Sequence, residues 1–216
     1  MATIKSLQLY QLQAKYENKK LKKAIRKNKK LDKKLERIEK QEEAKKQKQI
    51  DIENRRIAKE QARQQKEIER QEKLKEKQLT LDKRYIRMAS IWAENSYCTR
   101  RKVGALIVKN QMIISDGYNG TPSGFENICE DDNGVTKPYV LHAEANAITK
   151  IARSNNSSNG ATLYVTASPC IECAKLIIQA GIKRVVYSEK YRLEDGLELL
   201  KKANIEVVYV NAKNEE

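Results

Sequence analysis

The chain has 216 residues, a formal net charge of +15 and 39% hydrophobic residues, of which no more than four are consecutive. Because a bilayer-spanning helix needs roughly 20 apolar residues, we expect neither a membrane-spanning nor a collagen-like protein. The positive charge lies at the start: residues 1–80 hold 26 Lys and Arg against 13 Asp and Glu, whereas residues 81–216 hold 18 against 16. This division predicts a charged extension over 1–80 and one globular domain over 81–216.

The extension is predicted to be helical or disordered. It has no Pro or Gly and is rich in Lys, Glu, Gln, Arg and Ala, which favour a helix. A 3-4 spacing of apolar residues runs through Leu21, Ala24, Leu31, Leu35 and Ile38. Since this coiled-coil pattern covers fewer than three heptads, we expect mainly an exposed, solvated helix or tail. Helix pairing through the same residues, and binding of nucleic acid or of an anionic surface by residues 1–80, are the less favoured alternatives.

After Thr80 the pattern changes to alternating helices and strands. Strands are expected at 103–108, 112–118, 161–166, 184–187 and 206–210, and helices near 86–98 and at 142–153, 170–180 and 194–203. A loop rich in Gly, Asn, Pro and Ser follows the second strand, over about 117–138. The order α-β-β-α-β-α-β-α-β predicts an α/β fold, a three-layer α/β/α sandwich with a mixed five-stranded sheet.

The most specific motif pairs His142-Ala143-Glu144 with Pro169-Cys170-Ile171-Glu172-Cys173. One imidazole and two thiolates are three zinc ligands, and a catalytic zinc keeps its fourth position for water. Both groups fall at predicted helix N-termini, where the positive helix end favours thiolates over thiols. The motif therefore predicts Zn²⁺ held by His142, Cys170 and Cys173, with Glu144 as general acid and base.

A Cys-x-x-Cys pair alone is more often a structural zinc half-site or a redox pair. Here His142 is the only histidine, which excludes a site closed by two Cys and two His. A site made of all four cysteines would leave Glu144 and Pro169 unexplained, so we favour the catalytic interpretation. The remaining Cys98 and Cys129 are expected to be small, buried or reduced thiols, with neither a disulfide framework nor a complete second metal site.

With these motifs, the sequence resembles the cytidine and deoxycytidylate deaminase superfamily, and within it the deoxycytidylate (dCMP) deaminases, over about residues 81–210. Four stretches carry the resemblance: Cys98–Ala105, Gly117–Gly124, Leu141–Ile148 and Ser168–Lys175. The Gly-Tyr-Asn-Gly-x-Pro loop of the second stretch distinguishes the chain from tRNA adenosine and guanine deaminases, which share the zinc residues. The resemblance implies hydrolytic deamination of dCMP to dUMP and ammonia with Zn²⁺, which supplies dUMP for thymidylate synthesis.

The resemblance also implies residues that bind the substrate. Asn119 would hold the deoxyribose hydroxyl, and Arg100 and Tyr191 would contact the phosphate, since a guanidinium grips a phosphate dianion with two hydrogen bonds. Neighbouring cations that can share this role are Arg101, Lys102 and Arg192.

Partners and location complete the expectations. Many members of the family are homo-oligomers regulated by dCTP and dTTP, so both are expected here. With neither a targeting segment nor a membrane span in the sequence, a cytoplasmic protein is expected. Two alternatives stay open: a polynucleotide or free-nucleoside cytidine deaminase, and an assembly protein built on a deaminase scaffold.

Overall fold

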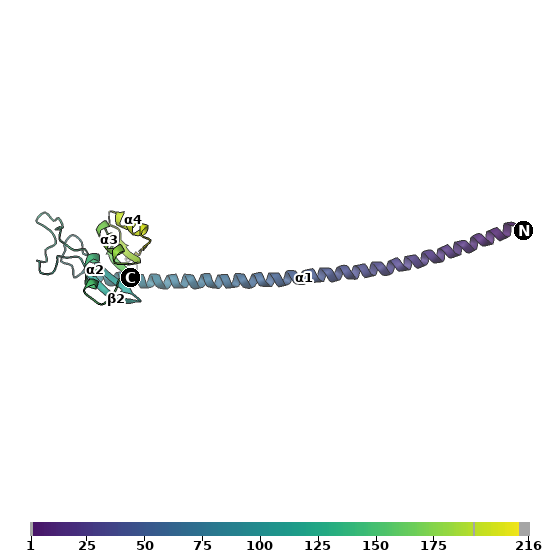
Figure 1. Ribbon diagram of the computed structural model, residues 1–216, viewed down its shortest axis with the longest axis horizontal. Coiled ribbons are helices and arrows are strands. Elements are labelled where there is room, and N and C mark those ends of the chain that lie inside the picture. The colour runs from purple at the N-terminus through teal and green to yellow at the C-terminus, as the bar shows by residue number, and fades with distance from the viewer. Residues whose placement is uncertain (1, 192, 212–216) are drawn as a thin grey trace. The chain divides into compact units, whose positions relative to one another are not determined.

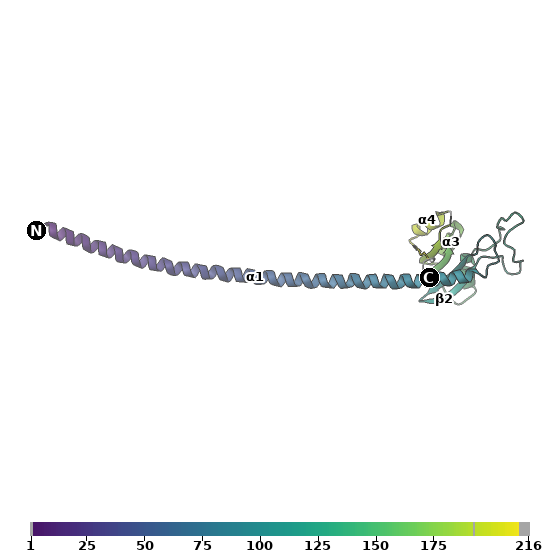
Figure 2. The same ribbon diagram turned by 180° about the vertical axis from the view of Figure 1, so that it is seen from behind.

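The structure is a computed structural model that describes residues 2–191 and 193–211 (Figures 1 and 2). Its elements are α1 (Ala2–Ala93), β1 (Gly104–Lys109), β2 (Met112–Tyr118), α2 (Ala143–Ala152), β3 (Thr162–Ala167), α3 (Ile171–Gln179), β4 (Arg184–Glu189), α4 (Asp195–Lys202) and β5 (Glu206–Tyr209). This order confirms the predicted succession of helices and strands. By its internal contacts the chain divides into two compact units, one that ends at Arg70 and one that begins at Gln71.

The first unit consists of α1 residues alone, and every side chain described in it is exposed. Contacts within it are local, such as the 2.8 Å hydrogen bond from Gln47 to Asp51 and the 3.7 Å ion pair of Arg70 with Glu67. Among the described helices, none combines the length and the apolar character that crossing a bilayer needs.

The prediction of a separate short helix near residues 86–98 is wrong. Instead, α1 continues through Thr80 and ends at Ala93. No Pro occurs before Pro122 and no Gly before Gly104, so nothing in the sequence breaks the helix where its composition changes. The last turns of α1 belong to the second unit.

The second unit is built on a mixed five-stranded sheet in the order β2-β1-β3-β4-β5. Strand β1 pairs antiparallel with both β2 and β3, while β3, β4 and β5 run parallel. The helix α2 connects β2 to β3, while α3 and α4 form the crossovers that the parallel neighbours β3–β4 and β4–β5 require. The carboxyl end of β3 and the residues after it thereby meet the segments around β1 and α2.

Alternate residues of the central strands are buried on opposite faces of the sheet. Ile107 and Val165 belong to a core cluster with α2, α3 and α4, whereas Leu106 and Tyr164 belong to a second cluster with Ile86 of α1. Full burial of such side chains stabilises the fold by about 1.5–3 kcal/mol each. The two clusters make three layers, which confirms the predicted α/β/α sandwich.

A buried polar network fastens the end of α1 to the sheet. The Asp82 carboxylate, in a residue that is 1% exposed, accepts hydrogen bonds from Arg184 at 2.8 and 2.7 Å, from the Tyr164 hydroxyl at 2.8 Å and from Gln78 at 2.9 Å. Burial opposes ionisation of Asp82, but the hydrogen bonds from Arg184, Gln78 and Tyr164 outweigh it and hold its pKa below the ordinary value. Asp82 is therefore the charged centre of this contact.

Candidate active site

Two helix N-termini bring the sequence-predicted metal ligands together. His142 is the N-cap of α2, Cys170 is the N-cap of α3, and Cys173 lies in the first turn of α3. One ligand atom from each residue can be chosen so that all three lie within 4.8 Å of one another. The helix termini also place the positive ends of two helix dipoles beside the two sulfur atoms.

The donor set fits zinc. The His142 Nδ1 atom lies 3.5 Å from the Cys170 Sγ atom and 3.3 Å from the Cys173 Sγ atom. Ligands at the usual zinc distances and tetrahedral angles are about 3.5 Å apart, so both separations suit one shared ion. An imidazole and two thiolates leave one tetrahedral position for water or substrate, which is the pattern of catalytic rather than structural zinc.

Two glycines allow the ligand-bearing segments to pack closely. A Cβ atom at Gly117 of β2 would meet the backbone of Ala143 and Ala147 in α2. A Cβ atom at Gly196 of α4 would meet the backbone of Pro169 and Cys170. Both positions therefore need glycine for close backbone approach.

Hydrogen bonds among the two thiols and the imidazole shift the pKa values of all three groups. A hydrogen bond from Cys173 and one from His142 lower the pKa of Cys170 to about 3. The same hydrogen bond between the two thiols, together with burial, raises the pKa of Cys173. A hydrogen bond to Cys170 raises the pKa of His142. Zinc binding would also require Cys173 to lose its proton, since the thiolate is the metal ligand.

Glu144 lies in the first turn of α2 and is buried. The residue is 4% exposed, and burial raises the pKa of its carboxyl group above the ordinary value. It lines the same cavity, of about 280 Å³, as His142 and Cys170. A buried carboxyl group with a raised pKa beside a metal site is suited to accept and return a proton near neutral pH.

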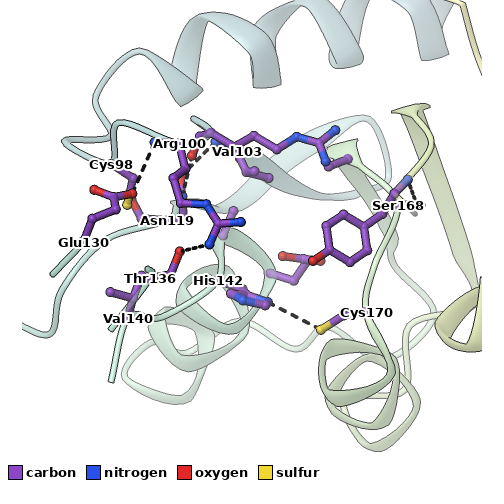
Figure 3. Close-up of a pocket in the computed structure, with 15 residues that line it drawn as sticks. Cys98, Arg100, Val103, Asn119, Glu130, Thr136, Val140, His142, Ser168 and Cys170 are labelled. Atoms are coloured by element: carbon purple, nitrogen blue, oxygen red, sulfur yellow. Dashed lines mark hydrogen bonds between the residues drawn. The ribbon is translucent and has the colours of Figure 1, made fainter. Parts of the chain in front are cut away.

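Arg100 lies on the wall of this cavity. Its guanidinium group donates a 3.2 Å hydrogen bond to the Thr136 hydroxyl, and both Arg100 and His142 line the cavity (Figure 3). Its backbone N–H and that of Thr99 donate to the Glu130 carboxylate at 3.3 and 3.2 Å. Burial opposes ionisation of Glu130, but these hydrogen bonds, the Thr99 side chain and the Arg100 charge together lower its pKa. Glu130 therefore fixes the backbone that carries Arg100.

Asn119 lines the cavity and is held by two backbone contacts. Its Oδ1 atom accepts a 2.8 Å hydrogen bond from the Val103 N–H, and its Nδ2 atom donates a 2.8 Å hydrogen bond to the Arg101 carbonyl. An amide offers two acceptor and two donor positions, so one of each is left for a ligand. The side chain is oriented before a substrate arrives.

Tyr191 and Arg101 also line the cavity. The Tyr191 N–H donates a 2.7 Å hydrogen bond to the Ser168 hydroxyl, and the Arg101 guanidinium lies 6.0 Å from the Tyr191 ring centre. Arg101 pairs with Glu189 at 2.7 Å. Lys102 donates to the Glu94 carbonyl at 3.3 Å and is not part of the cavity lining, and Arg192 lies outside the described residues.

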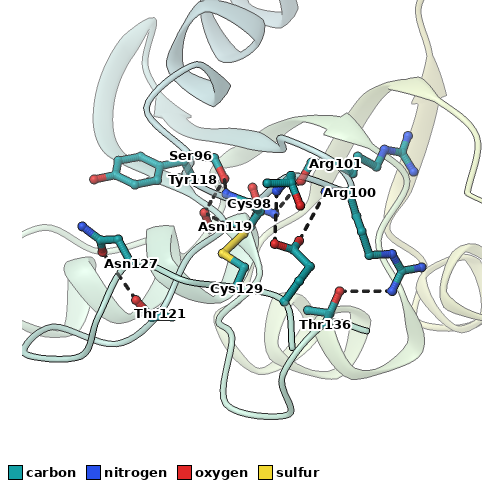
Figure 4. The surroundings of a disulfide bond; sticks show 12 residues. Ser96, Cys98, Arg100, Arg101, Tyr118, Asn119, Thr121, Asn127, Cys129 and Thr136 are labelled. Atoms are coloured by element: carbon teal, nitrogen blue, oxygen red, sulfur yellow. Dashed lines mark hydrogen bonds between the residues drawn. A yellow bond between two sulfur atoms is a disulfide. The ribbon is translucent and has the colours of Figure 1, made fainter. Parts of the chain in front are cut away.

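Cys98 and Cys129 are buried as expected, but the expectation that they are reduced thiols is wrong. They form a disulfide with an S–S distance of 2.09 Å and a Cα–Cα distance of 5.1 Å (Figure 4). The bond joins the segment after α1 to the loop between β2 and α2. The two cysteines are 31 residues apart and the loop between them has no periodic pattern, so the sequence did not predict this pairing.

The structure thus brings all seven sequence-predicted site residues together. Six of them line the cavity, and Cys173 is buried beside them. Sequence inspection missed the other polar residues of the wall: Glu130, Thr136 and Ser168. Ser168 is adjacent to the Pro-Cys motif, and this position could have indicated that it lines the site. Glu130 and Thr136 lie in the irregular loop, where no sequence pattern indicates a functional role.

Comparison with known proteins agrees with this geometry. The family described as "Cytidine and deoxycytidylate deaminase zinc-binding region" matches residues 79–189. The deoxycytidylate deaminase of Enterobacteria phage T4 is 37% identical over 60% of this chain and 89% of its own length. The human deoxycytidylate deaminase is 39% identical over 51% of this chain and 66% of its own length.

Solved structures give the same relationship. The crystal structure of dCMP deaminase from the cyanophage S-TIM5, in complex with dCMP and dUMP, is 45% identical. It superposes with a TM-score of 0.59 over 61% of this chain and 97% of that one. With the ligand set and the fold in agreement, the chain belongs to the cytidine and deoxycytidylate deaminase family, whose zinc-binding region it contains.

Proposed function

We propose that the protein deaminates dCMP hydrolytically to dUMP and ammonia, in a catalytic domain over residues 81–216. One observation carries the proposal: the cavity that holds His142, Cys170 and Glu144 also holds a guanidinium group, that of Arg100. The first three residues suit the hydrolytic removal of an amine from a nucleobase, and the Arg100 cation suits a monophosphate on the same small molecule.

The roles of the individual residues follow from their places in the cavity. Zinc held by His142, Cys170 and Cys173 would lower the pKa of a water molecule toward about 7 and so supply the nucleophile. Glu144 takes the proton of the attacking water and delivers it to the ring nitrogen of cytosine. The oxygen of that water bonds to the ring carbon that carries the amine. Glu144 then transfers the proton of the new hydroxyl group to the amine as the carbon–nitrogen bond breaks, so that a carbonyl group and ammonia result.

The walls of the cavity bind the rest of the substrate. Asn119, already oriented by Val103 and Arg101, offers its second donor and acceptor positions to the deoxyribose hydroxyl. Arg100 gives up a neutral partner, the Thr136 hydroxyl, in favour of the phosphate dianion. The Tyr191 side chain stands at the same wall and contacts that phosphate.

A panel of dCMP, CMP, deoxycytidine and a cytosine-containing oligonucleotide tests the assignment on the purified full chain with zinc. We expect the highest kcat/KM for dCMP. A preference for the oligonucleotide or for deoxycytidine would contradict the proposal and favour a polynucleotide or nucleoside deaminase.

Glu144→Gln tests the mechanism within the same assay. The substitution keeps size and removes the proton carrier, so kcat for dCMP should fall at least 100-fold, as expected for loss of general acid–base catalysis. The matched control is Glu172→Gln, since Glu172 is also in the first turn of a ligand-bearing helix but pairs with Lys175 at the surface. Zinc content, measured by atomic absorption, should be the same in both variants; full activity of the Glu144 variant would contradict the mechanism.

The predicted partners follow from family membership, and the predicted location follows from the sequence alone. A homo-oligomer and regulation by dCTP and dTTP stay predictions, which sedimentation of the full chain with and without dCTP would test. A cytoplasmic location stays a prediction as well; the Cys98–Cys129 disulfide does not support it, since disulfides are rare in cytosolic proteins.

A further inference from the structure

The basic residues of α1 gather on one side of the helix between Lys15 and Lys45. This segment holds 14 Lys and Arg and six Asp and Glu. At roughly 100° per residue, all fourteen basic residues fall within about half of the helix circumference, and all six acidic residues fall on the opposite side. We call the first side the basic face; it is formed by Lys15, Lys19, Lys20, Lys22, Lys23, Arg26, Lys27, Lys29, Lys30, Lys33, Lys34, Arg37, Lys40 and Lys45.

The charge is also concentrated along the chain. Residues 15–34 alone hold 11 Lys and Arg against two acidic residues, so this quarter of the extension carries +9 of the +15 of the whole sequence. All these side chains are exposed. The full basic face, 31 residues long, extends for about 45 Å at 1.5 Å per residue.

The opposite side of the helix argues against a lipid surface as the partner. It carries the exposed apolar residues Leu21, Ile25, Leu31, Leu35 and Ile38. The six carboxylates lie among them: Glu17, Asp32, Glu36, Glu39, Glu42 and Glu43. A helix in a membrane interface buries its apolar side, and these carboxylates would then lose water beside anionic headgroups.

The basic face instead suits a long polyanion that lies along the helix without burying its other side. Duplex nucleic acid carries one charge per about 1.7 Å of axis, which is two charges per base pair of about 3.4 Å. A length of about 45 Å therefore corresponds to about 13 base pairs. Twelve of the fourteen basic residues are Lys, a flexible point charge that neutralises phosphates without reading bases. Pairing of two copies through the apolar side would leave both basic faces available.

We propose that the basic face of α1 binds the phosphate backbone of duplex nucleic acid without sequence preference. The site is separate from the cavity and its chemistry, and it does not depend on what the cavity deaminates.

Fluorescence anisotropy of a labelled 30-base-pair DNA of random sequence, titrated with the full chain, tests the proposal. We expect binding at 50 mM salt that weakens at least 100-fold by 200 mM, because each neutralised phosphate releases counterions. An independent random sequence should bind equally well. Absence of binding at 50 mM salt would overturn the proposal.

Charge reversal locates the contact. The quadruple variant Lys22→Glu, Arg26→Glu, Lys30→Glu and Lys33→Glu changes the middle of the basic face and should weaken binding at least 100-fold. The control variant has the same net charge as the quadruple variant, but its substitutions lie in the mixed-charge part of α1: Lys59→Glu, Arg63→Glu, Lys66→Glu and Arg70→Glu. It should bind DNA within about threefold of the original chain. Equal losses in the two variants would overturn the assignment to the basic face. Circular dichroism checks that both keep their helix.

Two further probes decide between classes of polyanion. Vesicles with 30% phosphatidylserine and a polyglutamate peptide should both bind more weakly than the DNA duplex at equal salt. Tighter binding of either would overturn the proposal in favour of a lipid surface or an acidic protein.

Discussion

Arg100 and Arg101 are neighbours in sequence and in the cavity wall, but one guanidinium group has a charged partner and the other has a neutral partner. Arg101 is paired with the Glu189 carboxylate at 2.7 Å, whereas Arg100 donates to the neutral Thr136 hydroxyl. A neutral partner is easily exchanged for a phosphate oxygen, since charge-assisted hydrogen bonds are about twice as strong as neutral ones. Arg100 is therefore the better candidate for the phosphate contact.

Arg100→Gln should raise KM for dCMP about 10- to 100-fold, because hydrogen bonds to a charged group contribute about 1.5–3 kcal/mol. Deamination of deoxycytidine, which has no phosphate, should be unchanged. Lys102→Gln is the matched control, since Lys102 is an adjacent cation outside the cavity. Steady-state kinetics on both substrates checks this, and a similar loss with both substrates would mean that Arg100 only shapes the cavity.

Asp82 makes a pH-dependent contribution to stability. Its pKa is lowered in the folded state, so its stabilisation is present above the ordinary value of 3.8 and is lost as the pH falls through the still lower folded value. Asp82→Asn should lower the free energy of unfolding by about 3 kcal/mol at pH 7, because it leaves the Arg184 charge without its buried partner. The difference between the two proteins should shrink below about pH 4.

Urea unfolding at pH 7 and at pH 3.5 measures both effects. Asp116→Asn is the control, because Asp116 pairs with Lys150 at the surface and such pairs contribute less than about 1 kcal/mol. A loss at pH 7 no larger than that of the control would show that the Asp82 network adds nothing to stability.

At the scale of elements, the metal site depends on how closely α4 approaches the start of α3. Gly196→Ala should lower zinc affinity about 10- to 100-fold, as expected when the support of a metal ligand is displaced. Alanine is the better helix former by about 1 kcal/mol, so the substitution favours α4 itself and any loss comes from packing on Pro169 and Cys170.

Competition with a chromogenic chelator measures the zinc affinity. Gly120→Ala is the matched control, since a Cβ atom there meets nothing within 4 Å and no left-handed backbone is involved. Unchanged zinc binding by the Gly196 variant would show that α3 adjusts without moving Cys170.

What the sequence predicts at this scale depends on how local the signal is. The strands and helices from Gly104 onward follow from short apolar patterns, and the zinc ligands lie in two short motifs at helix starts. The network of Asp82 with Arg184 joins residues 102 apart, so no local pattern reveals it. The continuity of α1 was missed because the change of composition after Thr80 resembled a boundary, although no helix breaker stands there.

At the scale of the whole molecule, the charge and the chemistry belong to different parts of the chain. Residues 1–80 carry +13 and residues 81–216 carry +2, although the latter contain the cavity in which we propose that a monophosphate binds. A monophosphate needs one or two cations at fixed positions, while a polyanion needs many along a line. The two parts therefore suit ligands of different size.

The cavity wall also depends on a long connection. The loop between Tyr118 and Ala143 contains only two isolated bridges, Gly120 with Leu141 and Glu130 with Thr136, yet it supplies Asn119, Glu130 and Thr136 to the cavity. Irregular loops of this length in a folded domain are commonly functional. The disulfide of Cys98 with Cys129 ties this loop to the segment that carries Arg100.

The double variant Cys98→Ser and Cys129→Ser should therefore lose both stability and substrate affinity. Removing a cross-link between residues 31 apart should lower the free energy of unfolding by about 2–4 kcal/mol in oxidising buffer. KM for dCMP should rise by a larger factor than kcat falls. The variant removes the cross-link between two segments of the cavity wall but leaves His142, Cys170 and Glu144 in place. A phosphine reductant should shift the original chain toward the variant and leave the variant unchanged, with zinc content measured throughout. Equal sensitivity of both proteins to the reductant would instead place its effect at Cys170 and Cys173.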